Sequence, residues 1–297
     1  MKKKNILITG FDGFLGSNLL KKIDPNKYCI YGIGYTRKKL NKSFFLNRKI
    51  TYKNLSFFKK KNISIIIHCA GSPMVGLNFQ NDFKKNVLTT YEILEFAKSL
   101  ENKPKIITMS SMAVYGNQYK KKIKENFDLN PFSFYGLNKK ICEEICNYYS
   151  KKFKINIFAL RVASLFGVGL KKQFIYHVTK KLRNGVFKFW GKGDERRDYI
   201  HIDDLCNIVN ILLQKKFLGF KVINCGSGNI YNISEIIKKI LFILGIKKDK
   251  LKFTGLGINE NPKYLIPDLS FLNYFCKHKT NRNFNDDLKE FILSQKK

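Results

Sequence analysis

Tyr135 and Lys139 stand four residues apart at the expected start of a helix, in the sequence Tyr-Gly-Leu-Asn-Lys. On a helix this spacing places both side chains on one face. A neighbouring ammonium stabilises a phenolate, so the lysine is expected to lower the tyrosine pKa from about 10 toward the range of an acid–base catalyst. The pair therefore predicts a group that takes a proton from a hydroxyl and gives it back.

Two adjacent serines are candidates for a second hydroxyl in the same chemistry. Ser110 and Ser111 end an apolar run of strand length, and Met-Ala-Val-Tyr-Gly follows them. In open α/β sheets the carboxyl ends of the strands face the crevice that holds the ligand. A serine there can hydrogen-bond a substrate oxygen and share its proton with Tyr135.

Gly10, Gly13 and Gly16 follow directly on a short apolar segment near the start of the chain. The first glycine permits a tight turn, the second lets the backbone approach a phosphate, and the third lets the next helix pack on the strand. The N–H groups and the positive dipole end of a helix beginning at Phe14 would face that phosphate. This context is the one that a pyrophosphate cradle for a dinucleotide requires.

The elements that must hold these residues alternate between strand and helix. Apolar runs of strand length lie at 5–10, 28–34, 50–55, 63–70, 105–110 and 156–162. Segments of helical period lie at 14–23, 80–100 and 135–153. This alternation predicts an α/β fold with a doubly wound parallel sheet. In the helix at 135–153, the spacing predicts one buried face made by Ile141, Ile145, Tyr148 and Tyr149.

The alternation changes after about residue 168. Beyond it we expect a helix at 171–184, a short strand at 187–190, a helix opened by 199–204, a strand ending at 224–228 and an amphipathic helix at 233–244. We therefore divide the chain into a dinucleotide-binding domain at 1–168 and a mainly substrate-binding lobe at 169–297, interleaved with the last strands of the sheet.

Length and composition limit the class of protein. A chain of 297 residues with 44% hydrophobic residues can bury a full core. No window approaches the ~18 uninterrupted apolar residues of a membrane span. The Lys-rich start is like that of a signal peptide, but Asp12 interrupts its apolar run, so we expect a cytoplasmic protein. The seven cysteines lack metal-ligand spacing, which predicts reduced thiols and no metal site.

The formal net charge of +34 raises the question of nucleic-acid binding. Only seven of the 56 cationic residues are Arg, and the Lys residues are spread along the whole chain. Sites that read nucleic acid concentrate Arg and interleave aromatic residues on one surface. We therefore expect no specific nucleic-acid partner, and a general attraction for anionic substrates.

The order of these motifs resembles that of the extended short-chain dehydrogenase/reductases, in particular the NAD-dependent nucleotide-sugar epimerase/dehydratase family. The resemblance runs from about residue 5 to 270. Besides the motifs above it rests on His68-Cys-Ala-Gly71, Asn86-Val-Leu-Thr-Thr90, Glu125, Pro131 to Lys139, Arg161 to Gly169 and Arg197 to Asp204. It implies a Rossmann-type sheet with a smaller C-terminal substrate-binding lobe, and a homodimer formed by the helices at 80–100 and 135–153.

The resemblance also implies roles for individual residues. Tyr135 would be the general acid–base, Lys139 would hold the nicotinamide ribose, and Ser111 would be the catalytic serine, with Ser110 as the alternative. The cofactor site would consist of Gly10, Gly13, Phe14, Leu15, Gly16, Arg37, Ala70, Gly71, Asn86, Tyr135 and Lys139. The nucleotide-sugar site would consist of Ser111, Ser164, Trp190 and Arg197.

Some of these residues have a plain structural alternative. Trp190 would lie against the nucleotide base, or else pack in the core. Arg197 would pair with the substrate diphosphate, or else with a neighbouring aspartate. His68 and His201 lie in apolar contexts without ligand-spaced partners, so we expect core or loop-anchoring histidines.

Departures from the family pattern bear on the cofactor and the reaction. Met112 and Ala113 stand where dehydratases place Asp-Glu, so a 4,6-dehydration is not expected. Ser164 stands where many relatives have Asn. No acidic residue follows the second strand to bind the adenosine ribose, and Arg37 and Lys38 are at hand for a 2′-phosphate, so the cofactor is NAD or NADP.

The sequence therefore predicts an enzyme that transfers hydride on a nucleotide sugar. The first hypothesis is a nucleotide-sugar 4-epimerase, and the alternative is an NADPH-dependent reductase of a nucleotide 4-keto sugar. The same residues would serve both, because the cofactor carries the difficult chemistry. A third hypothesis is a non-catalytic dinucleotide-binding protein on the same fold. The tail at 271–297 supports no functional inference.

Overall fold

The computed structural model describes residues 3–35, 44–72, 78–117, 119–255, 262–277, 280 and 282–295. Its centre is a parallel sheet of seven strands in the order β10–β6–β5–β4–β1–β2–β3. These strands are β1 (Lys4–Thr9), β2 (Tyr28–Gly34), β3 (Phe45–Asn47), β4 (Ile63–His68), β5 (Lys105–Ser111), β6 (Ile157–Val162) and β10 (Phe220–Cys225). The order reverses between β1 and β4, which confirms the doubly wound sheet and places the ligand crevice at that point.

Helices cover both faces of the sheet. One face carries α1 (Phe14–Lys22), α7 (Ile202–Gln214) and α9 (Ser270–Cys276), and the other carries α2 (Tyr52–Leu55), α4 (Thr89–Ser99) and α5 (Phe134–Phe153). Neighbouring residues of one strand point into opposite cores: Ile6 and Ile8 pack under α1 and α7, and Leu7 packs under α4. Strands buried on both faces must be apolar throughout, which explains the continuous apolar runs in the sequence.

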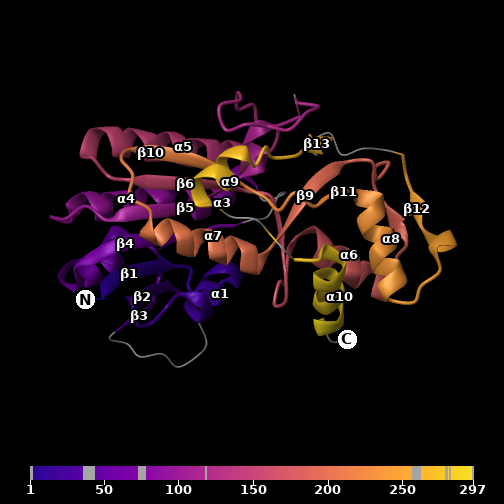
Figure 1. Ribbon diagram of the computed structural model, residues 1–297, viewed down its shortest axis with the longest axis horizontal. Helices are drawn as coiled ribbons and strands as arrows, with labels where there is room; N and C mark the ends of the chain where they lie inside the picture. The colour runs from indigo at the N-terminus through magenta and orange to yellow at the C-terminus, as the bar shows by residue number, and fades with distance from the viewer. Residues whose placement is uncertain are drawn as a thin grey trace.

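A smaller lobe, at the right of Figure 1, contains most of the second half of the chain. Its elements are β7 (Ser164–Phe166), α6 (Gln173–Arg183), β9 (Arg196–His201), β11 (Ile230–Asn232), α8 (Ile233–Ile243), β13 (Tyr264–Leu265) and α10 (Phe284–Ser294). A two-stranded sheet of β8 (Lys188–Phe189) and β12 (Lys252–Phe253) completes it. Its core includes Phe166, Tyr199 and Phe291. Because α7, β10 and α9 return to the main sheet, the lobe and the sheet are interleaved along the chain.

The expected strand at 50–55 is wrong. The Thr51 side chain accepts a hydrogen bond from the Asn54 N–H and starts α2, which continues into a 3-10 helix at Ser56–Lys61. A threonine that caps a helix offers the backbone an alternative to strand pairing. The strand that pairs with β2 lies earlier, at Phe45–Asn47.

The buried face of α5 differs from the prediction. Of the four residues expected there, Tyr149 is buried, Ile141 and Ile145 are half-buried, and Tyr148 is 57% exposed. The face that packs on the sheet includes the carboxylate of Glu143, which is buried with partners from β5 and β6. A hydrophobic pattern takes no account of a charged residue that is buried in an ion pair. The pattern therefore indicated a face of α5 that is rotated about the helix axis from the face that packs on the sheet.

The described ranges contain all seven cysteines, and none of these forms a disulfide. No group of three or more His, Cys, Asp or Glu side chains there is arranged to hold a metal ion. Nor does any helix among them combine the length and apolarity that crossing a bilayer requires.

Candidate active site

A cavity of about 950 Å³ opens between the sheet and the smaller lobe. Its sheet side lies at the carboxyl ends of β1, β4, β5 and β6, and its lobe side is formed by the segment before α6 and by β9. A space of this size holds an extended organic ligand. The cavity lies where doubly wound sheets bind their ligands.

The turn from β1 into α1 requires glycine at two of its three glycine positions, Gly10 and Gly16. Gly10 has φ +66°, and a Cβ there would lie 2.9 Å from the backbone of Ala70. A Cβ on Gly16 would lie 2.2 Å from the carbonyl oxygen of Gly10. Gly13 directly precedes α1 and has no side chain with which to cap its N–H groups. These N–H groups are therefore left for an anionic ligand in the cavity.

The structure brings most of the predicted cofactor residues together. Those that line the cavity are Gly10, Gly13, Phe14, Leu15, Gly16, Ala70, Gly71, Tyr135 and Lys139. Arg37 and its neighbour Lys38 lie outside the described residues. Asn86 is buried beside the cavity rather than in its wall.

Asn86 holds the loop that follows β4. It lies in a π-helical turn, Lys84–Leu88, that interrupts the expected helix at 80–100 between α3 (Phe79–Phe83) and α4. Its amide donates to Asp82 and to the carbonyl oxygen of Ser72, and its oxygen accepts the Ser72 N–H. A Cβ on Gly71 would lie 2.6 Å from that oxygen. Asn86 therefore fixes the backbone that lines the cavity at Gly71.

Tyr135 and Lys139 enter the cavity from the first turns of α5. Ser133 begins the helix by accepting the N–H of Gly136. The Lys139 Nζ lies 5.9 Å from the centre of the Tyr135 ring and donates to the carbonyl oxygen of Met109, at 2.8 Å. Because that carbonyl belongs to β5, the sheet holds the ammonium on the same side of the helix as the phenol.

The two serines at the end of β5 have different partners. The hydroxyl of Ser110 donates to the buried carboxylate of Glu143. Both serines line the cavity, and the Oγ of Ser111 accepts the N–H of Ala113 at 3.2 Å. A hydroxyl that accepts one hydrogen bond keeps its own proton to donate. Ser111 therefore keeps a proton to donate at the cavity, whereas the proton of Ser110 is already donated to Glu143.

That support is a buried ion pair between α5 and β6. Arg161 donates through Nε and Nη2 to the two carboxylate oxygens of Glu143, at 3.0 and 2.7 Å. Its Nη1 donates to the hydroxyl of Tyr115, which in turn donates to Asn224 of β10 at 2.9 Å. Each of these groups satisfies another, as buried charges must. The network ties α5, which carries Tyr135, to three strands of the sheet.

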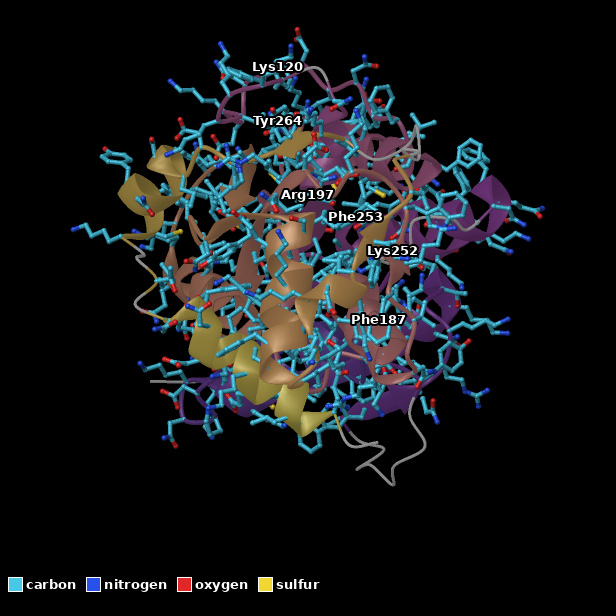
Figure 2. The ribbon with its side chains drawn as sticks, turned by 90° about the vertical axis from the view of Figure 1, so that its right-hand side faces the viewer. Lys120, Phe187, Arg197, Lys252, Phe253 and Tyr264 are labelled. Carbon is cyan, nitrogen blue, oxygen red and sulfur yellow. The ribbon has the colours of Figure 1, made fainter. Side chains whose placement is uncertain are left out.

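On the lobe side, Ser164 and Arg197 line the cavity, and Trp190 does not. In Figure 2, which looks onto the outer side of the lobe, Arg197 is labelled between Tyr264 and Phe253. Neither adjacent aspartate pairs with it: Asp194 forms an ion pair with Lys263, and Asp198 accepts the N–H groups of Ser227 and Gly228. The Trp190 side chain is 63% exposed, so it is not a core residue either.

Sequence reasoning missed part of the lobe side and one residue of the glycine turn. The missed cavity residues include Asp12, Lys171, Lys172, Gln173 and His177. Gln173, the first residue of α6, has φ +68°, a conformation that a non-glycine side chain adopts only where its surroundings hold it. Two adjacent lysines before a helix were a visible signal, but the Lys-rich composition concealed it.

His68 and His201 serve the scaffold, as expected. The Nδ1 of His68 lies 2.7 Å from Thr9 Oγ1, and its Nε2 lies 3.3 Å from Thr90 Oγ1. Burial and then the nearby Lys139 ammonium lower the pKa of His68 to about 3. His201 caps α7 by accepting the N–H of Asp203.

The His68 pKa predicts a stability that depends on pH. In the unfolded chain the pKa of this histidine is about 6.5. Between pH 6.5 and 3 the unfolded state therefore binds a proton at His68 and the folded state does not. Above pH 6.5, His68 therefore leaves the free energy of unfolding unchanged. Below pH 6.5 it should lower the free energy of unfolding by about 1.4 kcal/mol per pH unit, down toward pH 3. Urea unfolding of His68→Asn should lose this slope between pH 6.5 and 5. The exposed His177, changed to Asn, is the control and should keep it.

A model of the NAD dependent epimerase/dehydratase family matches residues 6–233 of the chain. The chain is 28% identical over 272 residues to a putative UDP-glucose 4-epimerase of Methanocaldococcus jannaschii, covering 87% of this chain and 86% of that protein. It is 30% identical over 274 residues to a dTDP-D-glucose 4,6-dehydratase of Dictyostelium discoideum, covering 81% of this chain and 62% of that protein.

A solved structure extends this similarity to nearly the whole chain. UDP-glucuronic acid 4-epimerase from Bacillus cereus, in complex with UDP-glucuronic acid and NAD, is 25% identical and superposes with a TM-score of 0.86. The superposition covers 98% of each chain. The smaller lobe therefore has a counterpart in that enzyme as well as the sheet.

Proposed function

The chain belongs to the NAD dependent epimerase/dehydratase family, and we propose that it is a nucleotide-sugar 4-epimerase that works with a bound dinucleotide. The observation that carries this proposal is that Ser111, Tyr135 and Lys139 meet the glycine turn at one cavity. The names of two similar proteins, both 4-epimerases, support the choice of reaction.

The residues of the sheet side fit a dinucleotide. The glycine turn packs tightly, since a Cβ at Gly10 or Gly16 would meet backbone atoms. It presents the uncapped start of α1 to the cavity, where a pyrophosphate would bind. Gly71, beyond β4, forms the next part of the wall, and Lys139 offers a cation near the end of β5. When bound, the nicotinamide accepts a hydride from the sugar carbon and can return it.

The protein's own part of the reaction is to move one proton. With the C4 hydroxyl of the sugar between Ser111 and Tyr135, the phenolate oxygen of Tyr135 takes the hydroxyl proton as the carbon is oxidised. The Ser111 hydroxyl hydrogen-bonds the sugar oxygen, and the Lys139 ammonium stabilises the phenolate. On return, Tyr135 gives the proton back to the same oxygen. Which face of the sugar then receives hydride decides between epimerisation and reversal.

The charges on the lobe side suit the diphosphate of a nucleotide sugar. Arg197 comes from β9, and its Nη1 donates to the carbonyl oxygen of Arg196 at 2.9 Å. Neither neighbouring aspartate pairs with it, so the other donors of its guanidinium can meet an oxyanion. Lys171 and Lys172 add two cations to the same wall. Among the described residues, Asp12 is the only acidic side chain that lines the cavity, and it lies on the sheet side.

Two other reactions have weaker support. A 4,6-dehydratase needs an acid and a base beside the tyrosine, and here Met112 and Ala113 fill the positions where the resemblance places them. An NADPH-dependent 4-keto-sugar reductase would use the same three catalytic residues. The absence of an acidic residue directly after β2 favours it as the second candidate. A non-catalytic dinucleotide-binding protein would not need Ser111, Tyr135 and Lys139 together at one cavity.

We propose a homodimer formed by α4 and α5. Apolar side chains that this pairing would cover are exposed on the two helices and the turn before them, including Leu88, Tyr91, Leu137 and Tyr148. Those on α5 belong to the face, with Ile141 and Ile145, that the sequence pattern had placed in the core of the subunit. A cytoplasmic location stays a prediction from the sequence.

The reaction is tested by purifying the protein without added cofactor, denaturing it and identifying any dinucleotide released. An epimerase restores its cofactor in each turnover, so we expect close to one NAD per chain. The protein should then interconvert UDP-glucose or UDP-glucuronic acid with its C4 epimer, followed by NMR, with no cofactor supplied. An empty protein that consumes NADPH with a nucleotide 4-keto sugar would instead be the reductase.

A further inference from the structure

Asp12 and Gly34 lie together although 21 residues separate them in the chain. Asp12 belongs to the glycine turn after β1, and Gly34 is the last residue of β2. A Cβ built on Gly34 would lie 2.3 Å from Oδ1 of Asp12, so the Asp12 carboxylate occupies the space that a side chain at 34 would take. The two positions are therefore alternatives: a residue larger than glycine at 34 excludes the aspartate from its place.

The end of the second strand is where a dinucleotide-binding sheet binds the adenosine ribose. In such sheets an acidic residue at the end of the second strand, about 20 residues beyond the glycine motif, bonds the ribose hydroxyls. Gly34 stands at that strand end and has no side chain to offer. Asp12 brings a carboxylate there from the neighbouring strand, and it lines the cavity together with Gly10 and Gly13.

We propose that Asp12 replaces the missing acidic residue of β2, binds the hydroxyls of the adenosine ribose and makes the site select NAD over NADP. The inference rests on the dinucleotide site of the proposed function, but not on the identity of the sugar or the reaction. The carboxylate accepts hydrogen bonds from the 2′- and 3′-hydroxyls of NAD. The 2′-phosphate of NADP would bring a doubly charged anion against it, and like charges this close repel strongly.

Backbone N–H groups hold the Asp12 carboxyl at the end of β2. Burial raises the pKa of this carboxyl, and the backbone N–H groups of Asp12 itself and of Tyr35 offset only part of that shift by bonding the charged form. Tyr35 directly follows Gly34, so the same strand end that lacks a side chain holds the borrowed carboxylate. The Asp12 carboxylate can occupy this position only because residue 34 is glycine.

The proposal is tested by the affinities of the full-length protein, freed of bound dinucleotide, for NADH and NADPH. Cofactor fluorescence or calorimetry measures both without any sugar, so a wrong assignment of the reaction leaves this result intact. We expect the wild type to bind NADH at least about tenfold more tightly than NADPH, the range of one or two hydrogen bonds to a charged group. Asp12→Asn should bring the ratio of the two dissociation constants close to one.

Two further variants make the result specific to this position. Asp249→Asn makes the same change of charge on an exposed residue far from the cavity and should leave the ratio unchanged. The double variant Asp12→Ala, Gly34→Asp moves the carboxylate back to the strand end and removes the side chain that would clash with it. It should restore the preference for NADH, and thermal unfolding checks that each variant is folded.

Clear results would overturn the proposal. A wild type that binds NADPH as tightly as NADH would do so, and so would an unchanged ratio in Asp12→Asn. If NADPH is preferred and Arg37→Ala abolishes that preference, the basic residues after β2 read the cofactor instead. Where Asp12→Asn is unstable, Asp12→Ala alone decides the question: a ratio that still favours NADH without the carboxylate overturns the proposal.

Discussion

Tyr135→Phe is expected to lower the rate of nucleotide-sugar turnover by about a thousandfold or more while leaving the affinity for the dinucleotide close to that of the wild type. The phenylalanine keeps the ring at the start of α5 and removes only the oxygen that carries the proton. The ring lies 5.9 Å from the Lys139 ammonium, which stays bonded to the carbonyl of Met109, so the cofactor side of the cavity should be unaltered.

The matched control for this change lies on α9. Tyr274→Phe removes one hydroxyl from an exposed tyrosine and should leave turnover within about twofold. Turnover is measured by NMR of the sugar and cofactor affinity by calorimetry. A loss of less than tenfold in Tyr135→Phe would show that Tyr135 does not carry the proton.

Glu143→Gln is expected to lower the free energy of unfolding by about 3–5 kcal/mol. The change keeps the shape of the side chain but leaves the Arg161 guanidinium buried without its counter-charge. Both side chains are only 5% exposed, and Arg161 makes its two bonds to Glu143 at 3.0 and 2.7 Å. Ser110 donates to the same carboxylate, so a third group loses its best acceptor. Urea unfolding at neutral pH measures the effect.

The next residue of α5 supplies the control for this prediction. Glu144 also faces a cation, Lys140, but at 4.0 Å and largely in solvent. Glu144→Gln should therefore change the free energy of unfolding by no more than about 0.5 kcal/mol. Replacing Glu143 and Arg161 together by leucine and methionine should cost less than Glu143→Gln alone, because no unpaired charge remains. Equal effects of Glu143→Gln and Glu144→Gln would mean that the buried pair contributes little.

Local rules were enough for the glycine turn and for the helix that carries Tyr135 and Lys139. Gly10 and Gly16 are required by contacts within a few residues and with one neighbouring strand, so their spacing in sequence already indicates the turn. Tyr135 and Lys139 share a face because a helix repeats every 3.6 residues. The strands were visible as apolar runs because each is buried on both faces.

The same local rules failed where a distant partner decides the outcome. The run at 50–55 has strand-like composition, but Thr51 caps a helix there, and β2 pairs with residues 45–47 instead. On α5, the pattern placed Tyr148 in the core, whereas the sheet is contacted by the face that includes Glu143, whose partner Arg161 comes from another strand.

By itself the sequence determined the class of fold, the glycine turn and the helix face shared by Tyr135 and Lys139, because these depend on contacts between residues close in the chain. Only the tertiary structure showed that the two serines have different partners, since Glu143 engages the hydroxyl of Ser110 from another element. Only the tertiary structure placed Asp12 in the side-chain space of Gly34. From the sequence the acid of β2 is missing, but parallel strands end at one edge, where a neighbouring turn can supply a carboxylate.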